Sequence, residues 1–340
     1  MTLDSLNPFA NRTMVLEPDE FFGRADELRD LYQRILRRQS VSLVGERRVG
    51  KSSLLNALRF QRTRPEYDIP DAIKFVYFDM QFVSGDEQSV IERLLDLIED
   101  ETGVREGSGR RRDIEPTLKT IQRRSMALVL LLDEFNLLTE NPNVPSTFYD
   151  LLRAIAGAFP VSYVTAYREG TVDALVAGLR EYGGLSPFMN IFGVVYVGPL
   201  KAEDADALVL DLAMDAGIEF SAEEVGRIQE IGGQLPFFLQ IAAYHAFEAK
   251  RRGGRIPWAQ VEAAFRVESE HHLQFLWSRL PVAEQTLLRA ICARAASAWN
   301  DLQHDRAFME LKKKGLLIET PDGARLFSSV FRQLIEGVAV

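Results

Sequence analysis

The chain has 340 residues, 46% hydrophobic and 26% charged, which is typical of a globular protein with two or three domains. Its formal net charge of −9 argues against a surface that binds nucleic acid throughout, and no apolar run is long enough to span a membrane. A single cysteine, Cys292, excludes a disulfide framework, and the N-terminus lacks the features of a secretory signal, so we expect a cytoplasmic protein.

The first elements expected along the chain are a helix at Asp26–Leu36 and a strand at Val41–Val44. A complete G-x-x-x-x-G-K-S motif follows the strand, Gly45-Glu-Arg-Arg-Val-Gly-Lys-Ser52, and a helical stretch at Ser53–Phe60 comes next. Between a strand and a helix N-terminus, this motif wraps backbone N–H groups around phosphates. The sequence therefore predicts a nucleotide-binding site.

Each residue type in the loop suits a phosphate. Gly45 and Gly50 allow backbone angles and close approaches that a Cβ would block. We expect backbone N–H groups of the loop to cradle the α- and β-phosphates, and Lys51 to supply a charge to the β- and γ-phosphates. Ser52 offers a hydroxyl to Mg²⁺. The predicted phosphate-binding residues are Gly45, Glu46, Arg47, Arg48, Val49, Gly50, Lys51, Ser52 and Ser53.

Apolar, β-rich runs alternate with amphipathic segments as far as Pro199. Buried strands that alternate with helices indicate a parallel sheet covered on both faces. We therefore expect an α/β fold over residues 1–200, a three-layer P-loop NTPase with a parallel five-stranded sheet. The expected strands are Val41–Val44, Phe75–Phe78, Leu128–Leu132, Val161–Thr165 and Val194–Val197. Further helices are expected at Ser89–Asp100, Pro116–Arg124, Ser146–Phe159 and Thr171–Leu179.

The strand signal stops after Leu200, and the chain becomes helical. Ser221-Ala-Glu-Glu224 is a capping box that opens one helix. Gly232-Gly-Gln-Leu-Pro236 separates that helix from another at Phe237–Arg252. These patterns predict a helical lid over residues 201–254.

Residues 255–340 combine helices with a hairpin. Helices are expected at Trp258–Leu280, Ala283–Ala293 and Leu302–Lys314. Two short strands then flank a Pro321-Asp-Gly323 turn, and a last helix is expected at Val330–Val338. This order of elements predicts a winged helix-turn-helix domain.

A second group of candidate residues ends the apolar run Leu128-Val-Leu-Leu-Leu-Asp133-Glu134. The strand would carry Asp133 to the C-terminal edge of the sheet, where it can hold Mg²⁺ through water. Glu134 would then orient or deprotonate an attacking water. The alternative is that the pair only ends the strand and opens a helix. The phosphate loop upstream favours the catalytic interpretation.

With these motifs the chain resembles the AAA+ and STAND group of P-loop ATPases, in particular its archaeal-type and bacterial stand-alone members, from about Asn7 to Ile335. Asn7-Pro-Phe and Phe21-Phe-Gly-Arg24-Ala-Asp-Glu27-Leu resemble the group's element before the first strand. Gly232–Pro236 resembles its lid turn, and Val161–Arg168 its sensor strand.

The resemblance implies further site residues. Phe22, Gly23 and Arg24 would pack near the adenine, and Pro236 would touch the base from the lid. Arg168 would read the γ-phosphate and join Lys51 and Glu134 as a catalytic residue.

The function implied is that of an ATP-binding and ATP-hydrolysing molecular switch with ATP and Mg²⁺ as cofactors. Exchange between ATP and ADP would reposition the winged-helix domain and control a protein partner or self-association. A membrane partner is not expected.

A second hypothesis is a DNA-binding ATPase of the initiator or transposition-helper type. Lys312-Lys-Lys314 ends the predicted recognition helix, although cations suit a helix C-terminus without any DNA. The basic stretches Arg105–Arg112 and Lys250–Arg255 fit a solvated loop and a helix end better than a nucleic-acid surface. A loop that binds nothing is disfavoured because Lys51, Ser52, Asp133 and Glu134 are all present.

Overall fold

The computed structural model describes residues 7–83, 85–167, 186–293, 306–320 and 323–337. The chain forms two compact units. The first unit is Met14–Val197, and the second comprises Gly198–Val340 together with the N-terminal segment that ends at Thr13. The chain therefore passes between the units twice: the first connection is Thr13–Met14 and the second is Val197–Gly198.

The first unit contains a five-stranded sheet in the order β2-β3-β4-β1-β5, and every neighbouring pair is parallel. This confirms the predicted α/β fold with a parallel five-stranded sheet. Because β4 lies between β1 and β3, the strand before the phosphate loop is separated from the strand that ends in Asp133. The strands are β1 Ser40–Val44, β2 Ile73–Asp79, β3 Ala127–Asp133, β4 Val161–Ala166 and β5 Phe192–Tyr196.

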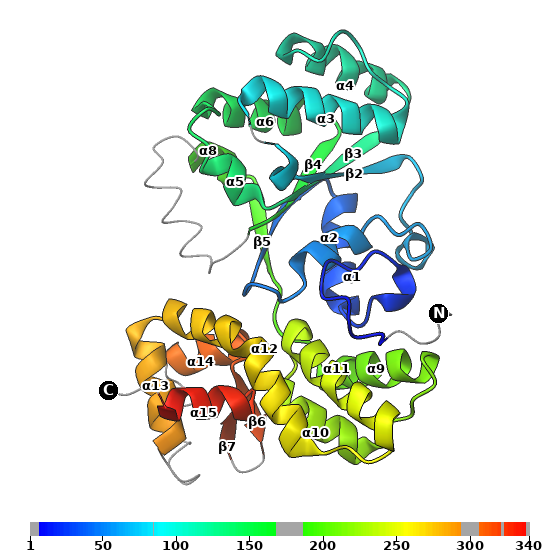
Figure 1. Cartoon of the computed structure of the whole chain (residues 1–340). Helices are drawn as coiled ribbons and strands as arrows, with labels where there is room; N and C mark the ends of the chain where they lie inside the picture. Colours follow the sequence, from blue (N-terminus) through cyan, green and yellow to red (C-terminus); the bar gives the residue numbers. More distant parts are fainter. Residues whose placement is uncertain (1–6, 84, 168–185, 294–305, 321–322, 338–340) are drawn as a thin grey trace. The chain divides into compact units, whose positions relative to one another are not determined.

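Helices cover both faces of this sheet (Figure 1). On one face lie α1 Ala25–Leu36 and α2 Lys51–Ala57. The other face packs against α3 Glu87–Thr102, α4 Ile114–Arg123, α5 Phe135–Thr139, α6 Ser146–Ala158 and α8 Ser186–Met189. Short 3-10 helices are η2 Pro18–Glu20, η3 Arg64–Tyr67, η4 Met80–Phe82 and η5 Arg111–Asp113. The helix predicted at residues 171–179 lies outside the described residues.

The alternation of side chains along β3 assigns each residue to one face of the sheet. Leu128, Leu130 and Leu132 join the core beneath α3, α4 and α6. Residues at odd positions point to the opposite face, which α1 and α2 cover. Asp133 continues the odd series, so it lies on the face of the phosphate-loop helix.

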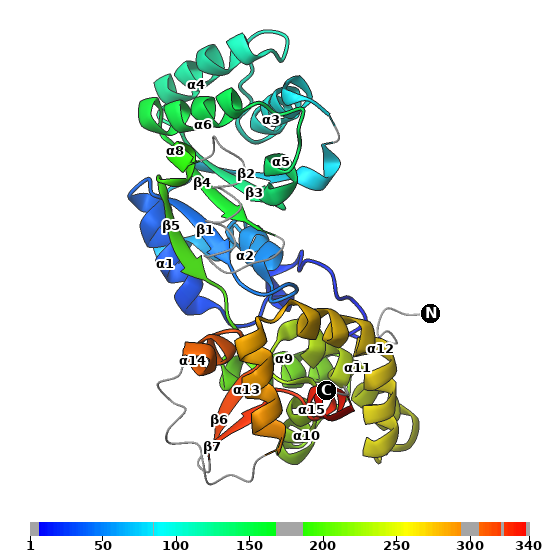
Figure 2. The same ribbon diagram turned by 90° about the vertical axis from the view of Figure 1, so that its left-hand side faces the viewer.

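The second unit is helical, with an antiparallel hairpin followed by a last helix near its C-terminal end, as the sequence predicts. The capping box at Ser221 is confirmed: the Glu224 N–H donates to Ser221 Oγ at 3.2 Å, and the Ser221 N–H donates to Glu224 Oε2 at 2.7 Å. Figure 2 shows the hairpin beside α14 and α15. The elements are α9 Ala202–Asp215, α10 Ala222–Gly232, α11 Pro236–Gly253, α12 Trp258–Arg279, α13 Val282–Ala293, α14 Arg306–Lys313, β6 Leu317–Thr320, β7 Gly323–Leu326 and α15 Ser329–Gly337.

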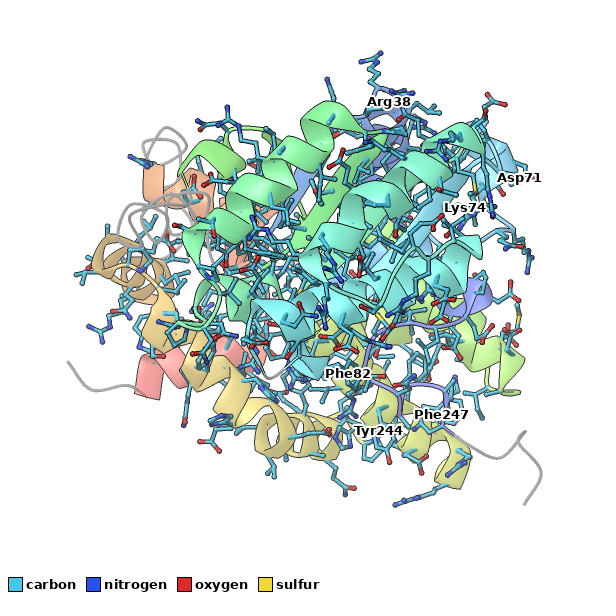
Figure 3. The ribbon with its side chains drawn as sticks, turned by 90° about the horizontal axis from the view of Figure 1, so that it is seen from above. Arg38, Asp71, Lys74, Phe82, Tyr244 and Phe247 are labelled. Carbon is cyan, nitrogen blue, oxygen red and sulfur yellow. The ribbon has the colours of Figure 1, made fainter. Side chains whose placement is uncertain are left out.

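The N-terminal segment packs against α11. The Asn7 side-chain amide donates to the Tyr244 carbonyl oxygen at 3.0 Å, and the buried Phe9 ring meets Phe247 edge to face at 6.0 Å. Figure 3 shows Tyr244 and Phe247 beside one another. The sequence predicts this segment as part of a domain at 1–200, whereas the structure groups it with the second unit. No local pattern marks a contact across 237 residues.

One ion pair of the second unit is fully enclosed. Lys314 Nζ donates to both carboxylate oxygens of Glu284 in α13, at 2.7 and 2.9 Å, and both side chains are buried. Lys312 and Glu319 form an exposed pair of the same length nearby, at 2.7 Å. The two pairs differ mainly in burial, so their comparison isolates the cost of leaving a charge without its partner.

We expect Glu284→Ala to destabilise the second unit by about 3–5 kcal/mol, because it leaves the Lys314 ammonium buried without its counter-charge. The matched change Glu319→Ala should cost no more than about 1 kcal/mol, since exposed pairs contribute little. Denaturant unfolding followed by circular dichroism measures both values. Equal losses in the two variants would contradict the assignment of the difference to burial.

Candidate nucleotide-binding site

The phosphate loop fills the turn between β1, which ends at Val44, and α2, which begins at Lys51. Helix α2 packs against β3 and β4, so it overlies the strand that carries Asp133. Two loop residues have left-handed backbone angles: Arg48 with a φ of 63° and Gly50 with a φ of 102°. The loop therefore changes direction within a few residues, as a phosphate-binding turn must.

Position 45 requires glycine because there is no room for a side chain, and not because of its backbone angle. A Cβ at this position would lie 2.2 Å from the carbonyl oxygen of Val197, the residue that follows the edge strand β5. The Val197 N–H in turn donates to the Val44 carbonyl at 2.7 Å. Only glycine fits here, because the backbone beyond β5 lies directly against the start of the loop.

Lys51 lies within the arc of the loop. Its ammonium donates to the carbonyl oxygens of Gly45 and Glu46, both at 2.8 Å, and the side chain is buried. Backbone carbonyls therefore hold a cation where the motif requires one. A lysine point charge at this place suits the β- and γ-phosphates of a nucleotide.

Arg24 braces the loop from α1. Its guanidinium donates to the carbonyl of Val49 and to the Glu27 carboxylate, both at 2.9 Å, and the side chain is 5% exposed. The residue precedes α1 with a φ of 67° and follows Gly23, whose φ is 69°. The sequence prediction places Arg24 near the adenine, and the contact observed for it is with the phosphate loop.

Residues that follow the first connection contact α2. The Val15 N–H donates to Ser53 Oγ at 3.1 Å, and the Val15 carbonyl accepts from the Asn56 amide at 2.9 Å. Ser53 thus uses its hydroxyl to hold Val15, which leaves its backbone N–H as the group that suits a phosphate. Phe22, from the same N-terminal part of the unit, is half-buried.

Asp133 is the last residue of β3, and Glu134 follows it as the residue before α5. Asp133 is 5% exposed and accepts two hydrogen bonds: the Glu134 N–H donates to Oδ1 at 2.9 Å, and the Tyr77 hydroxyl donates to Oδ2 at 2.6 Å. Glu134 has a left-handed φ of 50° and precedes α5, so a short helix does begin here. Such an angle is uncommon for a residue with a Cβ and turns its side chain out of the strand.

A further carboxylate lies beside Asp133. Asp79 pairs with Asp133 in the register of β2 and β3. Partial burial raises the pKa of Asp79, and the negative charge of Asp133 raises it further. Asp79 turns toward η4 and accepts the Gln81 N–H at 2.8 Å.

The donor chemistry of this edge fits magnesium. Within the described part of the chain, no three His, Cys, Asp or Glu side chains form a group that could bind a metal ion by themselves. Mg²⁺ that arrives with a nucleotide takes most of its ligands from phosphate and water. The sequence predicts the Ser52 hydroxyl and the Asp133 carboxylate as the oxygen donors that would complete such a shell, and this stays a prediction.

The predicted sensor strand is only partly described. β4 ends at Ala166, and Arg168 lies outside the described residues. The hydroxyl of Thr165 lies 3.0 Å from that of Ser42 and both residues are fully buried, so this pair links β4 to β1. The Thr165 side chain therefore forms a hydrogen bond between two strands of the sheet.

Pro236 is the first residue of α11 in the second unit. The turn before it contains Gly233, whose φ is 70° and whose Cβ would lie 2.5 Å from the Phe327 ring. The buried Ser328 hydroxyl donates to the Ile231 carbonyl. The residues between β7 and α15 therefore pack on the turn that contains the predicted base-contacting proline.

Sequence patterns miss several residues of this site. Tyr77, Val15 and Asn56 belong to no motif, and each acts through a contact with a distant part of the chain. Tyr77 carries one usable signal. It lies in the predicted strand Phe75–Phe78, two residues before Asp79, so in an extended chain both side chains share a face of the sheet.

A parallel five-stranded sheet, helices on both faces and a phosphate loop at the start of α2 define a P-loop nucleoside triphosphatase. Residues 5–335 match the family described as Novel STAND NTPase 1. The chain belongs to this family of nucleoside triphosphatases. A search of curated protein sequences gave no match.

Solved structures share the fold. A Walker-type ATPase of Pyrococcus abyssi is similar with a TM-score of 0.62 and 17% identity, over 97% of this chain and 99% of that one. The Aeropyrum pernix ORC2 protein, solved in ADPNP–ADP complexes, gives 0.55 and 17%, over 97% and 96% of the two chains. Drosophila ORC bound to DNA gives 0.52 and 13%, over 98% and 92%. Among the described helices, none combines the length and apolarity needed to cross a membrane.

We expect Arg24→Ala to weaken ATP binding by about tenfold, equivalent to about 1.4 kcal/mol, because the loop loses its contact at Val49. Unfolding stability should fall by about 1–3 kcal/mol, since a buried carbonyl is left without its donor. Calorimetric titration with ATP measures the affinity. Arg29→Ala is the matched control, since Arg29 lies in α1, the helix that Arg24 precedes, in an exposed pair with Asp26. Unchanged affinity in Arg24→Ala would refute the bracing role.

Proposed function

We propose that the chain is an ATP-driven molecular switch in which the nucleotide state of the phosphate loop controls the second unit. The observation that carries this proposal is that both connections between the units are attached to the loop region of the first unit. Val15, just after the first connection, bonds to α2, and Val197, just before the second, lies against Gly45. A shift of the loop or of α2 on nucleotide binding would move both connections together.

In this proposal ATP binds with its phosphates along Gly45–Ser53 and its charge near Lys51. Ser52 and Asp133 hold Mg²⁺, which supplies charge neutralisation at the phosphates when bound. Glu134 orients or deprotonates the attacking water, and Arg168 reads the γ-phosphate. Phe22, Gly23 and Pro236 provide contacts to the adenine.

Contacts within the second unit could transmit a movement of the turn before Pro236 to the hairpin. Gly233, in the turn between α10 and α11, and Ile231, near the end of α10, contact Phe327 and Ser328 after the hairpin. We assign residues 201–254 to the lid and 255–340 to a winged-helix domain. A nucleotide that contacts Pro236 would therefore bias the position of the hairpin. The output would be altered binding of a protein partner or of a second copy of the chain.

Duplex DNA is the second candidate partner, because the fold is shared with Drosophila ORC bound to DNA. Charge pairing at the C-terminal end of α14 does not favour it. Lys312 and Lys314 are held by Glu319 and Glu284. Members of the two basic stretches found in the sequence are paired as well: Arg105 with Asp96, Arg111 with Glu87 and Lys250 with Glu224.

To test the switch, we would measure scattering profiles and protease sensitivity with and without a slowly hydrolysed ATP analogue. Asn56→Ala removes the donor to the Val15 carbonyl, so it should abolish most of the nucleotide-dependent change. ATP affinity should stay within about threefold of wild type, which is less than 1 kcal/mol.

Two control variants are compared with Asn56→Ala. Asn141→Ala removes a similar bond from a side-chain amide to the Gly85 carbonyl, and it should behave as wild type. Lys51→Ala should lose ATP binding itself. A full nucleotide-dependent change in Asn56→Ala would exclude the first connection as the route, and tight ATP binding in Lys51→Ala would exclude the site.

For DNA we expect no duplex binding at physiological salt, because the lysines named above are already neutralised. Fluorescence anisotropy with a labelled duplex measures this across a salt series. Binding that weakens by about a thousandfold or more between low and moderate salt would instead indicate several phosphate contacts and establish the second candidate.

A further inference from the structure

Tyr77 contacts Asp133 through a strong hydrogen bond on the α2 face of the sheet. The hydroxyl donates to Asp133 Oδ2 at 2.6 Å, the length expected of a bond to a charged acceptor. We propose that Tyr77 is a positioning residue of the nucleotide site, which holds the Asp133 carboxylate in the orientation that presents it to the magnesium of Mg·ATP. This inference rests on the proposed metal role of Asp133.

The strand register explains how the phenol reaches this carboxylate. β2 and β3 run parallel with Tyr77 opposite Leu131 and Asp79 opposite Asp133. Tyr77 and Asp133 are thus two positions apart and on the same face. A tyrosine is long enough to span that offset, whereas the short Asp79 side chain turns to the Gln81 N–H.

Other contacts determine where the phenol points. The Arg59 guanidinium lies over the Tyr77 ring, 5.6 Å from its centre. The sulfur of Met14 lies 3.3 Å from the hydroxyl. A phenol is protonated at neutral pH, so the Tyr77 hydroxyl can donate to the carboxylate. Tyr77 therefore presents one fixed donor to Asp133.

A buried carboxylate beside a second one needs such a donor. Asp133 is almost fully enclosed, and Asp79 adds negative charge in register. The Glu134 N–H satisfies Oδ1 and Tyr77 satisfies Oδ2, which fixes the plane of the carboxylate. Each oxygen has a further lone pair that can accept a bond from metal-bound water. Without the phenol, only one of the two oxygens would be held in place.

Met14 links the Tyr77 hydroxyl to the first connection between the units. It is the first residue of its unit after the first connection, and its sulfur touches the same hydroxyl that holds Asp133. Tyr77 therefore lies between the carboxylate and the connection that the proposed switch uses.

The experiment compares Tyr77→Phe with wild type. The ring and its packing remain, and only the hydroxyl is removed. We expect the Mg²⁺ concentration for half-maximal ATPase activity to rise about tenfold, as is typical when a partner of a ligand is lost. A readout independent of turnover is the Mg²⁺ concentration that gives half of the ATP-dependent rise in melting temperature, and it should shift by the same factor.

Tyr163→Phe is the matched control, because that buried phenol donates to the Leu152 carbonyl at 2.8 Å. It should lower thermal stability without changing either magnesium value. In an Asp133→Asn background, Tyr77→Phe should have no further effect on the magnesium dependence.

The outcomes distinguish the metal role of Asp133 from the positioning role of Tyr77. If Asp133→Asn leaves the magnesium dependence unchanged, the metal role of Asp133 is wrong and this inference falls with it. If Asp133→Asn shifts the dependence but Tyr77→Phe does not, or if Tyr77→Phe shifts it equally in the Asp133→Asn background, the positioning role alone is overturned.

Discussion

Backbone carbonyl groups confine the phosphate loop, and the geometry of the site depends on that confinement. The Val197 carbonyl leaves no room for a side chain at position 45. The Lys51 ammonium binds the carbonyls of Gly45 and Glu46, and Arg24 donates to that of Val49. Contacts from the end of β5, from α2 and from the start of α1 thus meet in one short loop. A loop held in this way loses little freedom when phosphates bind, which favours affinity.

The order of the strands places the other half of the site. With β4 between β1 and β3, helix α2 lies over the strand that ends in Asp133. Parallel register then sets the partly buried Asp79 beside the buried Asp133, an arrangement unfavourable for two carboxylates. The structure separates them by turning Asp79 to a backbone N–H and giving Asp133 the Tyr77 phenol. The repulsion between these two carboxylates, which the fold imposes, is thus offset in part by Tyr77, a residue that belongs to no motif.

Local patterns were sufficient wherever the signal and the structure lie within a few residues. The loop between β1 and α2, the strand that ends at Asp133 and the capping box at Ser221 are of this kind. Local patterns do not predict the hydrogen bonds between Val15 and Ser53, between Arg24 and the loop, or between Asn7 and Tyr244. Each joins residues whose approach is set by how the whole sheet or helix packs, and sequence spacing contains no information about that distance.

The second unit is discontinuous in sequence, and this affects the order in which the chain can fold. Its N-terminal segment emerges first during synthesis, but the α11 residues that cover Phe9 come more than 200 residues later. The first unit is continuous and can form its sheet in the interval. The first unit is therefore inserted into the sequence of a mainly helical domain. Phe9 and Asn7 must stay without their native contacts until that domain is complete, when their docking closes the loop that contains the nucleotide site.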